Sequence, residues 1–167
     1  MIKKILGILL LCSFIVFLLT LYIDKTNNST LEEPINNLIS SVLTGERPGP
    51  ADRITEDQIK VYDDKVVIEI QNAKWAGFID TNSMDPLLDE DSNAIQIVPQ
   101  SEDEIQIGDI ISYESEYLGG TLIHRVIYIG EDENGKYFIA KGDNNPDPDP
   151  EKIRFSQIKR VLVGIIY

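Results

Sequence analysis

Cysteine and histidine are almost absent from this chain, whose 167 residues include one of each, Cys12 and His124. A single cysteine excludes a disulfide within the chain and any metal site built from several cysteines. A single histidine excludes zinc sites and proton relays that need two imidazoles. There is no glycine-rich phosphate loop, which argues against nucleotide binding. We therefore predict no metal and no cofactor, and any chemistry must use at most one imidazole.

Basic side chains are also few compared with acidic ones. The chain has 15 Lys and Arg against 28 Asp and Glu, a formal net charge of -13 at pH 7. This negative charge repels phosphate backbones, so nucleic acid is not an expected partner. With 43% hydrophobic residues, the composition is otherwise that of a globular chain, long enough for one domain with appendages.

One long apolar run lies near the N-terminus, at residues 5–23, and it contains no charged side chain. A helix of this length, at about 1.5 Å per residue, spans roughly 28 Å, close to the hydrocarbon thickness of a bilayer. Two lysines precede the run, which places residues 1–4 in the cytoplasm and the chain after residue 24 on the extracytoplasmic side. A cleaved signal peptide is the alternative, but the run is long and ends without small residues. We predict a single-pass membrane anchor.

Residues 24–58 are predicted to form a juxtamembrane helix and a linker. Thr30 and Glu33 have the spacing of a helix-capping box. The apolar residues that follow fall on one helical face: Ile35, Leu38, Ile39, Val42 and Leu43. Proline and glycine at positions 48–50 then indicate a linker.

From residue 59 onward the sequence has the pattern of strands. Alternating apolar segments occur at residues 61–70, 95–98, 109–113, 121–129, 137–141 and 159–166. Turn signals such as Leu118-Gly119-Gly120 separate them. Many short strands joined by close turns predict an antiparallel, mostly β domain over residues 59–167.

Three places in this domain carry side chains suited to catalysis. His124 lies within a strand pattern, and Ser83 lies in a turn before a proline. A proline-stiffened loop carries three acids: Asp143, Asp147 and Asp149. Each has an ordinary alternative, namely a core histidine, a serine capping its own turn, and a solvated or calcium-binding acidic loop. Together they offer a nucleophile, a base and an acid that orients the base.

The same residues resemble the type I signal peptidases, specifically the archaeal and endoplasmic-reticulum branch. The resemblance covers about residues 75–167 and the single anchor, and in the bacterial branch a lysine replaces the histidine. Four stretches carry it: Asn82-Ser83-Met84-Asp85-Pro86, Gly108-Asp109-Ile110-Ile111-Ser112-Tyr113, His124-Arg125-Val126-Ile127, and Lys141-Gly142-Asp143-Asn144-Asn145 with Asp149 after it.

The resemblance implies a signal-peptidase-like catalytic domain. It also implies a membrane-anchored serine endopeptidase that removes signal peptides from translocated proteins. Ser83 would be the nucleophile, His124 the general base and Asp149 the orienting acid. Thr81 would join the N–H of Ser83 in binding the oxyanion, and Asp143 would be a supporting residue. The implied partners are preproteins with signal peptides and the membrane, and the translocation machinery is a partner left open.

Two alternatives stay open at this point. Asp147 is a rival of Asp149 for the orienting acid. Asn82 stands where the family usually has glycine before the nucleophile, which leaves room for a catalytically inactive, membrane-tethered β domain acting as a binding module. Asparagine is, however, among the few residues that tolerate a left-handed backbone, so the turn can survive this replacement.

Overall fold

The structure, a computed structural model, describes residues 47–167. None of the helices within that range is long and apolar enough to cross a membrane. Residues 1–4, the anchor predicted at residues 5–23 and the helix predicted at residues 30–44 lie outside the described residues.

Antiparallel strands make up most of the described fold, as the alternating pattern predicts. The strands are β1 (Ile59–Val61), β2 (Val66–Ile68), β3 (Lys74–Ala76), β4 (Asn93–Ile97), β5 (Ile110–Ser115), β6 (Gly120–Asp132), β7 (Gly135–Lys141) and β8 (Ile158–Ile166). Three single-turn 3-10 helices accompany them: η1 (Glu56–Gln58), η2 (Glu102–Glu104) and η3 (Phe155–Gln157).

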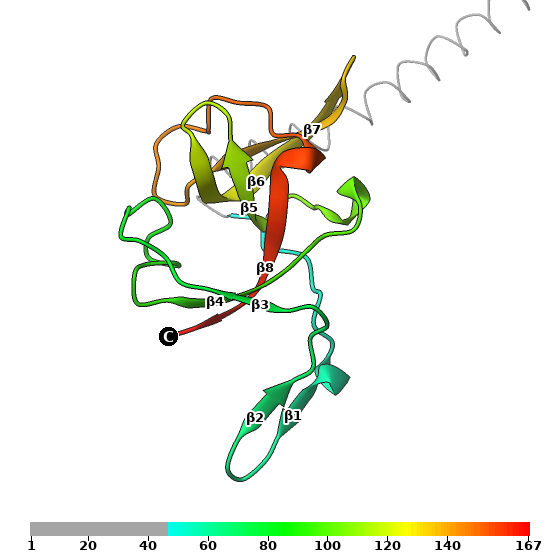
Figure 1. The fold of residues 1–167 in the computed structure, drawn as a ribbon, viewed down its shortest axis with the longest axis vertical. Helices are drawn as coiled ribbons and strands as arrows, with labels where there is room; N and C mark the ends of the chain where they lie inside the picture. Colours follow the sequence, from blue (N-terminus) through cyan, green and yellow to red (C-terminus); the bar gives the residue numbers. More distant parts are fainter. Residues whose placement is uncertain (1–46) are drawn as a thin grey trace, which may run out of the picture. The chain divides into compact units, whose positions relative to one another are not determined.

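Six strands form the main sheet in the order β3-β4-β8-β5-β6-β7, and each neighbouring pair is antiparallel. The C-terminal strand β8 lies between β4 and β5 and so joins the two halves of the sheet (Figure 1). Only β3 lies outside the predicted segments, because its sequence, Lys74-Trp75-Ala76, does not alternate and its pairing with β4 defines it. It is the edge strand from which the chain enters the turn that holds Ser83.

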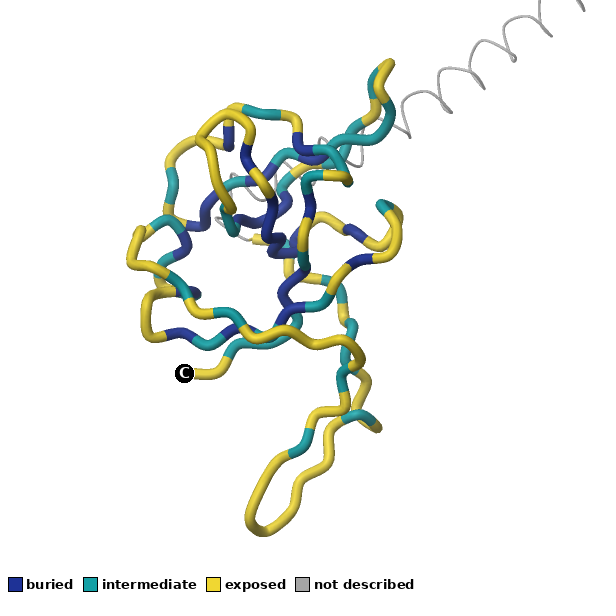
Figure 2. The backbone as a smooth tube through the Cα atoms, viewed as in Figure 1, coloured by how far each residue is buried: buried dark blue, intermediate teal, exposed yellow. Residues whose placement is uncertain are grey.

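Strands β1 and β2 form a separate two-stranded hairpin, with its turn at residues 63–64. Ile59 pairs with Ile68, and Val61 with Val66. These four apolar side chains are exposed, and the hairpin contrasts with the buried strands of the main sheet (Figure 2). The alternating pattern therefore predicts the strands of this segment correctly, although their apolar side chains are not part of a buried core.

The main sheet has two clusters of buried apolar side chains. The first contains Ile105, Ile111, Tyr113, Val126, Phe138, Ala140, Ile153, Ile158 and Val161. The second contains Met84, Leu88, Ala94, Ile110 and Leu162. Burying a side chain of the size of Met84 is worth about 1.5–3 kcal/mol. This burial holds the turn next to Ser83 against the sheet.

Residues 48–53 are fixed to the start of β5. The Arg53 guanidinium donates to both carboxylate oxygens of Asp109, at 2.8 and 2.9 Å, and the Ala51 N–H donates to the same carboxylate at 3.0 Å. Gly108 has φ +100, and a Cβ there would lie 2.0 Å from the carbonyl oxygen of Gly49. Only glycine permits this close approach. Pro48–Tyr167 accordingly forms one compact unit.

Candidate functional site

The turn after β3 presents Ser83. Asn82 has φ 55, the left-handed conformation that asparagine tolerates, so the replacement of glycine at this position does not prevent the turn. The next residue, Met84, is buried in the second cluster, whereas Ser83 is only half-buried. Burial of Met84 and the left-handed Asn82 together aim the Ser83 hydroxyl away from the core.

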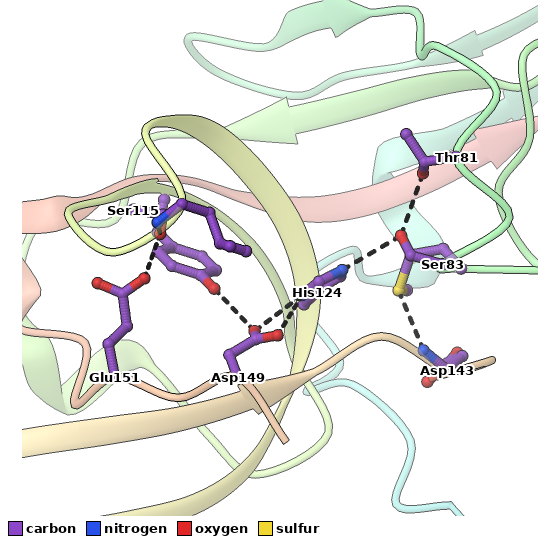
Figure 3. A network of polar contacts seen from close by, with 10 residues as sticks. Thr81, Ser83, Ser115, His124, Asp143, Asp149 and Glu151 are labelled. Atoms are coloured by element: carbon purple, nitrogen blue, oxygen red, sulfur yellow. Dashed lines mark hydrogen bonds and ion pairs between the residues drawn. The ribbon is translucent and has the colours of Figure 1, made fainter. Parts of the chain in front are cut away.

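His124 comes from the middle of β6, where it pairs with Ile111 of β5. The side chain is buried, and its Nε2 lies 3.2 Å from Ser83 Oγ (Figure 3). Although these two residues are 41 positions apart in the sequence, the fold brings them within hydrogen-bond distance. A central strand gives the imidazole a fixed backbone, which a loop would not.

Asp149 lies on the other side of the imidazole. Its two carboxylate oxygens are 2.9 and 2.8 Å from His124 Nδ1 (Figure 3). Its own N–H donates to the Ala140 carbonyl at 2.8 Å. A carboxylate only accepts hydrogen bonds, so Nδ1 carries the proton and Nε2 is free to accept from the Ser83 hydroxyl. Asp147 is exposed, and Asp149 rather than Asp147 contacts the histidine.

Asp143 binds Arg125 rather than His124. Arg125 Nε and Nη2 donate to the two Asp143 oxygens at 2.8 and 2.7 Å, and both side chains are buried. Arg125 Nη1 also donates to the carbonyl of Gly108 at 2.9 Å. Breaking a buried pair of this kind typically costs about 3–5 kcal/mol. Asp143 therefore holds the loop after β7 to β6, and its carboxylate pairs with Arg125.

The loop after β7 also holds the Ser83 turn. Asn144 donates from its N–H to the Ser83 carbonyl and from its side-chain amide to the Asn82 carbonyl, both at 2.9 Å. The backbone at Gly142 approaches so closely that a Cβ there would lie 2.6 Å from the Ser83 carbonyl oxygen. Sequence reasoning assigned no role to Asn144 or Gly142. No periodicity marks such contacts, because they depend on how two loops approach each other.

A second hydroxyl lies next to that of Ser83. Thr81 Oγ1 lies 3.2 Å from Ser83 Oγ, as two hydroxyls two residues apart in a tight turn can (Figure 3). Within residues 47–167 the Ser83 N–H donates to no acceptor. The turn thus offers one backbone donor and one hydroxyl near the nucleophilic oxygen.

Tyr113 of β5 is a further member of the site that sequence reasoning missed. Its hydroxyl donates to Asp149 Oδ2 at 2.7 Å, and its side chain is fully buried. Burial raises the pKa of Tyr113, and so do its hydrogen bond to Asp149 and the negative charges of Asp149 and Glu151. The phenol therefore stays protonated and remains a donor. The sequence did contain a signal for this contact, because a tyrosine in an apolar strand needs a hydrogen-bond partner for its hydroxyl.

The described residues contain no group of three or more His, Cys, Asp and Glu side chains placed to hold a metal ion. Their chemistry is that of a hydroxyl, an imidazole and a carboxylate in a row. Such a row lets the imidazole take the proton of the serine while the carboxylate stabilises the cation that forms. The arrangement can therefore support attack by Ser83 on a carbonyl carbon.

Comparison with known proteins adds little to this geometry. No family model matches the chain, and no solved structure matches it. A curated protein of Methanocaldococcus jannaschii, described only as uncharacterized, is 58% identical over 43 residues, which is 25% of this chain and 21% of that protein. The match thus spans about a fifth of the relative's length, and that relative's description states no activity.

Proposed function

We propose that the chain is a membrane-anchored serine endopeptidase that removes signal peptides from translocated proteins. The proposal rests on the continuous row of contacts from Asp149 through His124 to Ser83. The type I signal peptidase resemblance supports it, since the residues that the resemblance singles out for these roles are the ones in contact. Asn144 and Arg125, from two of the same four stretches, hold the row in place.

The reaction follows from the contacts. His124 Nε2 takes the proton of Ser83 as Oγ attacks the peptide carbonyl carbon. The tetrahedral oxyanion accepts hydrogen bonds from the Ser83 N–H and the Thr81 hydroxyl, and one such donor is worth about 2.7–4 kcal/mol. His124 then gives the proton to the leaving amine. Water, activated in the same way, hydrolyses the acyl-enzyme and frees Ser83.

The substrate class follows from the edge strand and the predicted anchor. Within the described residues β3 is paired on one side only, and it leads directly to the Ser83 turn. An extended peptide can add to such an edge through backbone hydrogen bonds. An anchor at residues 5–23 would keep the site at the extracytoplasmic membrane surface, where the signal peptides of translocated proteins emerge. We therefore expect cleavage of an extended segment that follows an apolar helix.

Cleavage of a model preprotein by the full-length protein in membranes tests the proposal. We expect the wild type to cleave and Ser83→Ala to lose cleavage, because no other group in the row can form the acyl-enzyme. Ser101→Ala is the matched control, because Ser101 is exposed and its side chain makes no cap hydrogen bond. Full processing by folded Ser83→Ala would overturn the proposal, as would no cleavage by the folded wild type of a preprotein that a known signal peptidase cuts.

Gly142→Ala is expected to slow cleavage without touching any reacting group. The added Cβ would lie 2.6 Å from the Ser83 carbonyl oxygen, so the nucleophile turn must move. A displacement of about 1 Å at a reacting atom can cost about 10²-fold in rate, and we expect a loss of this order in kcat/KM for the model preprotein. Gly164→Ala is the control, because its Cβ would make only ordinary contacts with Ile95, at 3.7 Å or more. Equal rates for the two variants would contradict this reading of the loop contact.

A further inference from the structure

Two hydroxyls on one strand meet two carboxylates on the loop after β7. Tyr113 and Ser115 are two residues apart on β5 and so share a face of the sheet. Asp149 and Glu151, also two residues apart, accept hydrogen bonds from them in order: Tyr113 Oη donates to Asp149 at 2.7 Å, and Ser115 Oγ donates to Glu151. The Ser115–Glu151 contact lies beside the row of Asp149, His124 and Ser83 in Figure 3.

These contacts help to fix the loop along the strand. Prolines at positions 146, 148 and 150 remove backbone donors, so few backbone bonds hold this stretch: the Asp149 N–H donates to the Ala140 carbonyl, and Ile153 pairs with Phe138. The Glu116 N–H donates a second hydrogen bond to Glu151 at 3.1 Å, and Gln157 Nε2 donates to the same carboxylate at 3.4 Å. These side-chain bonds add to the backbone bonds of Asp149 and Ile153, and together they place Asp149 rather than Asp147 opposite the histidine.

We propose that Tyr113 is a positioning residue, whose hydroxyl sets both the orientation and the effective charge of the carboxylate that faces His124. This inference rests on the proposed function, since it concerns the same site. Asp149 Oδ2 is the shared atom: it accepts from Tyr113 at 2.7 Å and lies 2.8 Å from His124 Nδ1. A carboxylate that already accepts one strong hydrogen bond attracts a neighbouring cation less strongly.

Tyr113 acts through Asp149 and does not touch the reacting atoms. The polar groups bonded to the imidazole are Asp149, from the loop after β7, and Ser83, from the turn after β3. The phenol itself is fully buried, so a substrate cannot reach it. Its removal should therefore change kcat and leave KM unchanged.

Tyr113→Phe tests the inference in the full-length protein. We expect kcat for the model preprotein to fall about tenfold, because the carboxylate that holds His124 loses the contact that orients it, and a misplacement of about 1 Å can cost about 10²-fold. His124 is the only histidine in the chain, so the NMR resonance of its Nδ1–H gives a single assigned signal. This signal should shift in Tyr113→Phe, because the tyrosine hydroxyl and Nδ1–H share the Oδ2 atom of Asp149. Tyr62→Phe removes the same hydroxyl from an exposed residue and should change neither quantity.

Each outcome separates this inference from the proposed function. A slower kcat together with a shifted Nδ1–H signal supports the positioning role. A slower kcat with an unchanged signal shows a merely structural contribution and overturns it, as does a wild-type kcat in Tyr113→Phe. If the wild type cleaves nothing, the proposed function fails on its own, and the Nδ1–H signal still decides whether Tyr113 acts on the carboxylate that faces His124.

Discussion

Replacing His124 by alanine is expected to lower kcat/KM for preprotein cleavage at least about 10⁴-fold, because no second imidazole can take the proton of Ser83. When residues act as one catalytic unit, removing a single member costs about as much rate as removing several. The doubly substituted chain, Ser83→Ala with His124→Ala, should therefore be about as slow as either single variant. Initial rates on the same preprotein, measured for the two single variants and the double variant, check this expectation.

A second variant, His124→Gln, controls for the unfolding that His124→Ala could cause. His124 is buried and bonded to Asp149, so alanine leaves that carboxylate with one partner fewer. His124→Gln keeps an amide that can donate to Asp149 but that cannot take a proton at neutral pH. It should unfold at a temperature near that of the wild type and still fail to cleave. Cleavage at the wild-type rate by folded His124→Gln would remove the histidine from the mechanism.

The strand patterns in the sequence predicted most of the main sheet, because its long strands contribute buried apolar side chains to the core. β5, β6, β7 and β8 were predicted within a few residues of their bounds, as was the turn between β5 and β6. Two features escaped this logic. β3 reads Lys74-Trp75-Ala76, which does not alternate, and its pairing with β4 defines it. The hairpin of β1 and β2 has the right alternation, but its apolar residues are exposed, so its pattern could not say where a core lies.

The candidate site was likewise predictable only in part. Ser83, His124 and Asp149 could be singled out from the sequence because their residue types and the family resemblance both point to them. The contacts that hold these three residues in place could not be predicted from the sequence. Tyr113 reaches Asp149 only through the register of β5 against the loop, and Asn144 reaches Ser83 only because two loops meet. Such contacts depend on tertiary placement, which neither composition nor periodicity encodes.

Asp149→Asn is expected to lower kcat/KM about 10⁴-fold, while Asp147→Asn leaves it nearly unchanged. The reason lies in the tautomer of His124. An amide that turns its N–H toward Nδ1 favours the proton on Nε2, and the imidazole then cannot accept the proton of Ser83. Asp147 is exposed, so it supplies a matched substitution two residues away on the same loop.

The pair of variants also decides between the two readings of the acidic loop. Both changes remove one negative charge from the same stretch, so a general effect of charge on substrate binding would lower both rates alike. Only a specific contact with the imidazole would make the two cleavage rates differ. That contact, at 2.8 Å from His124 Nδ1, is made by Asp149. If Asp147→Asn proved the slower variant, with both chains folded, the orienting acid would be Asp147. The loop would then have to shift by two residues, which would break the contacts of Tyr113 and Ser115 as well.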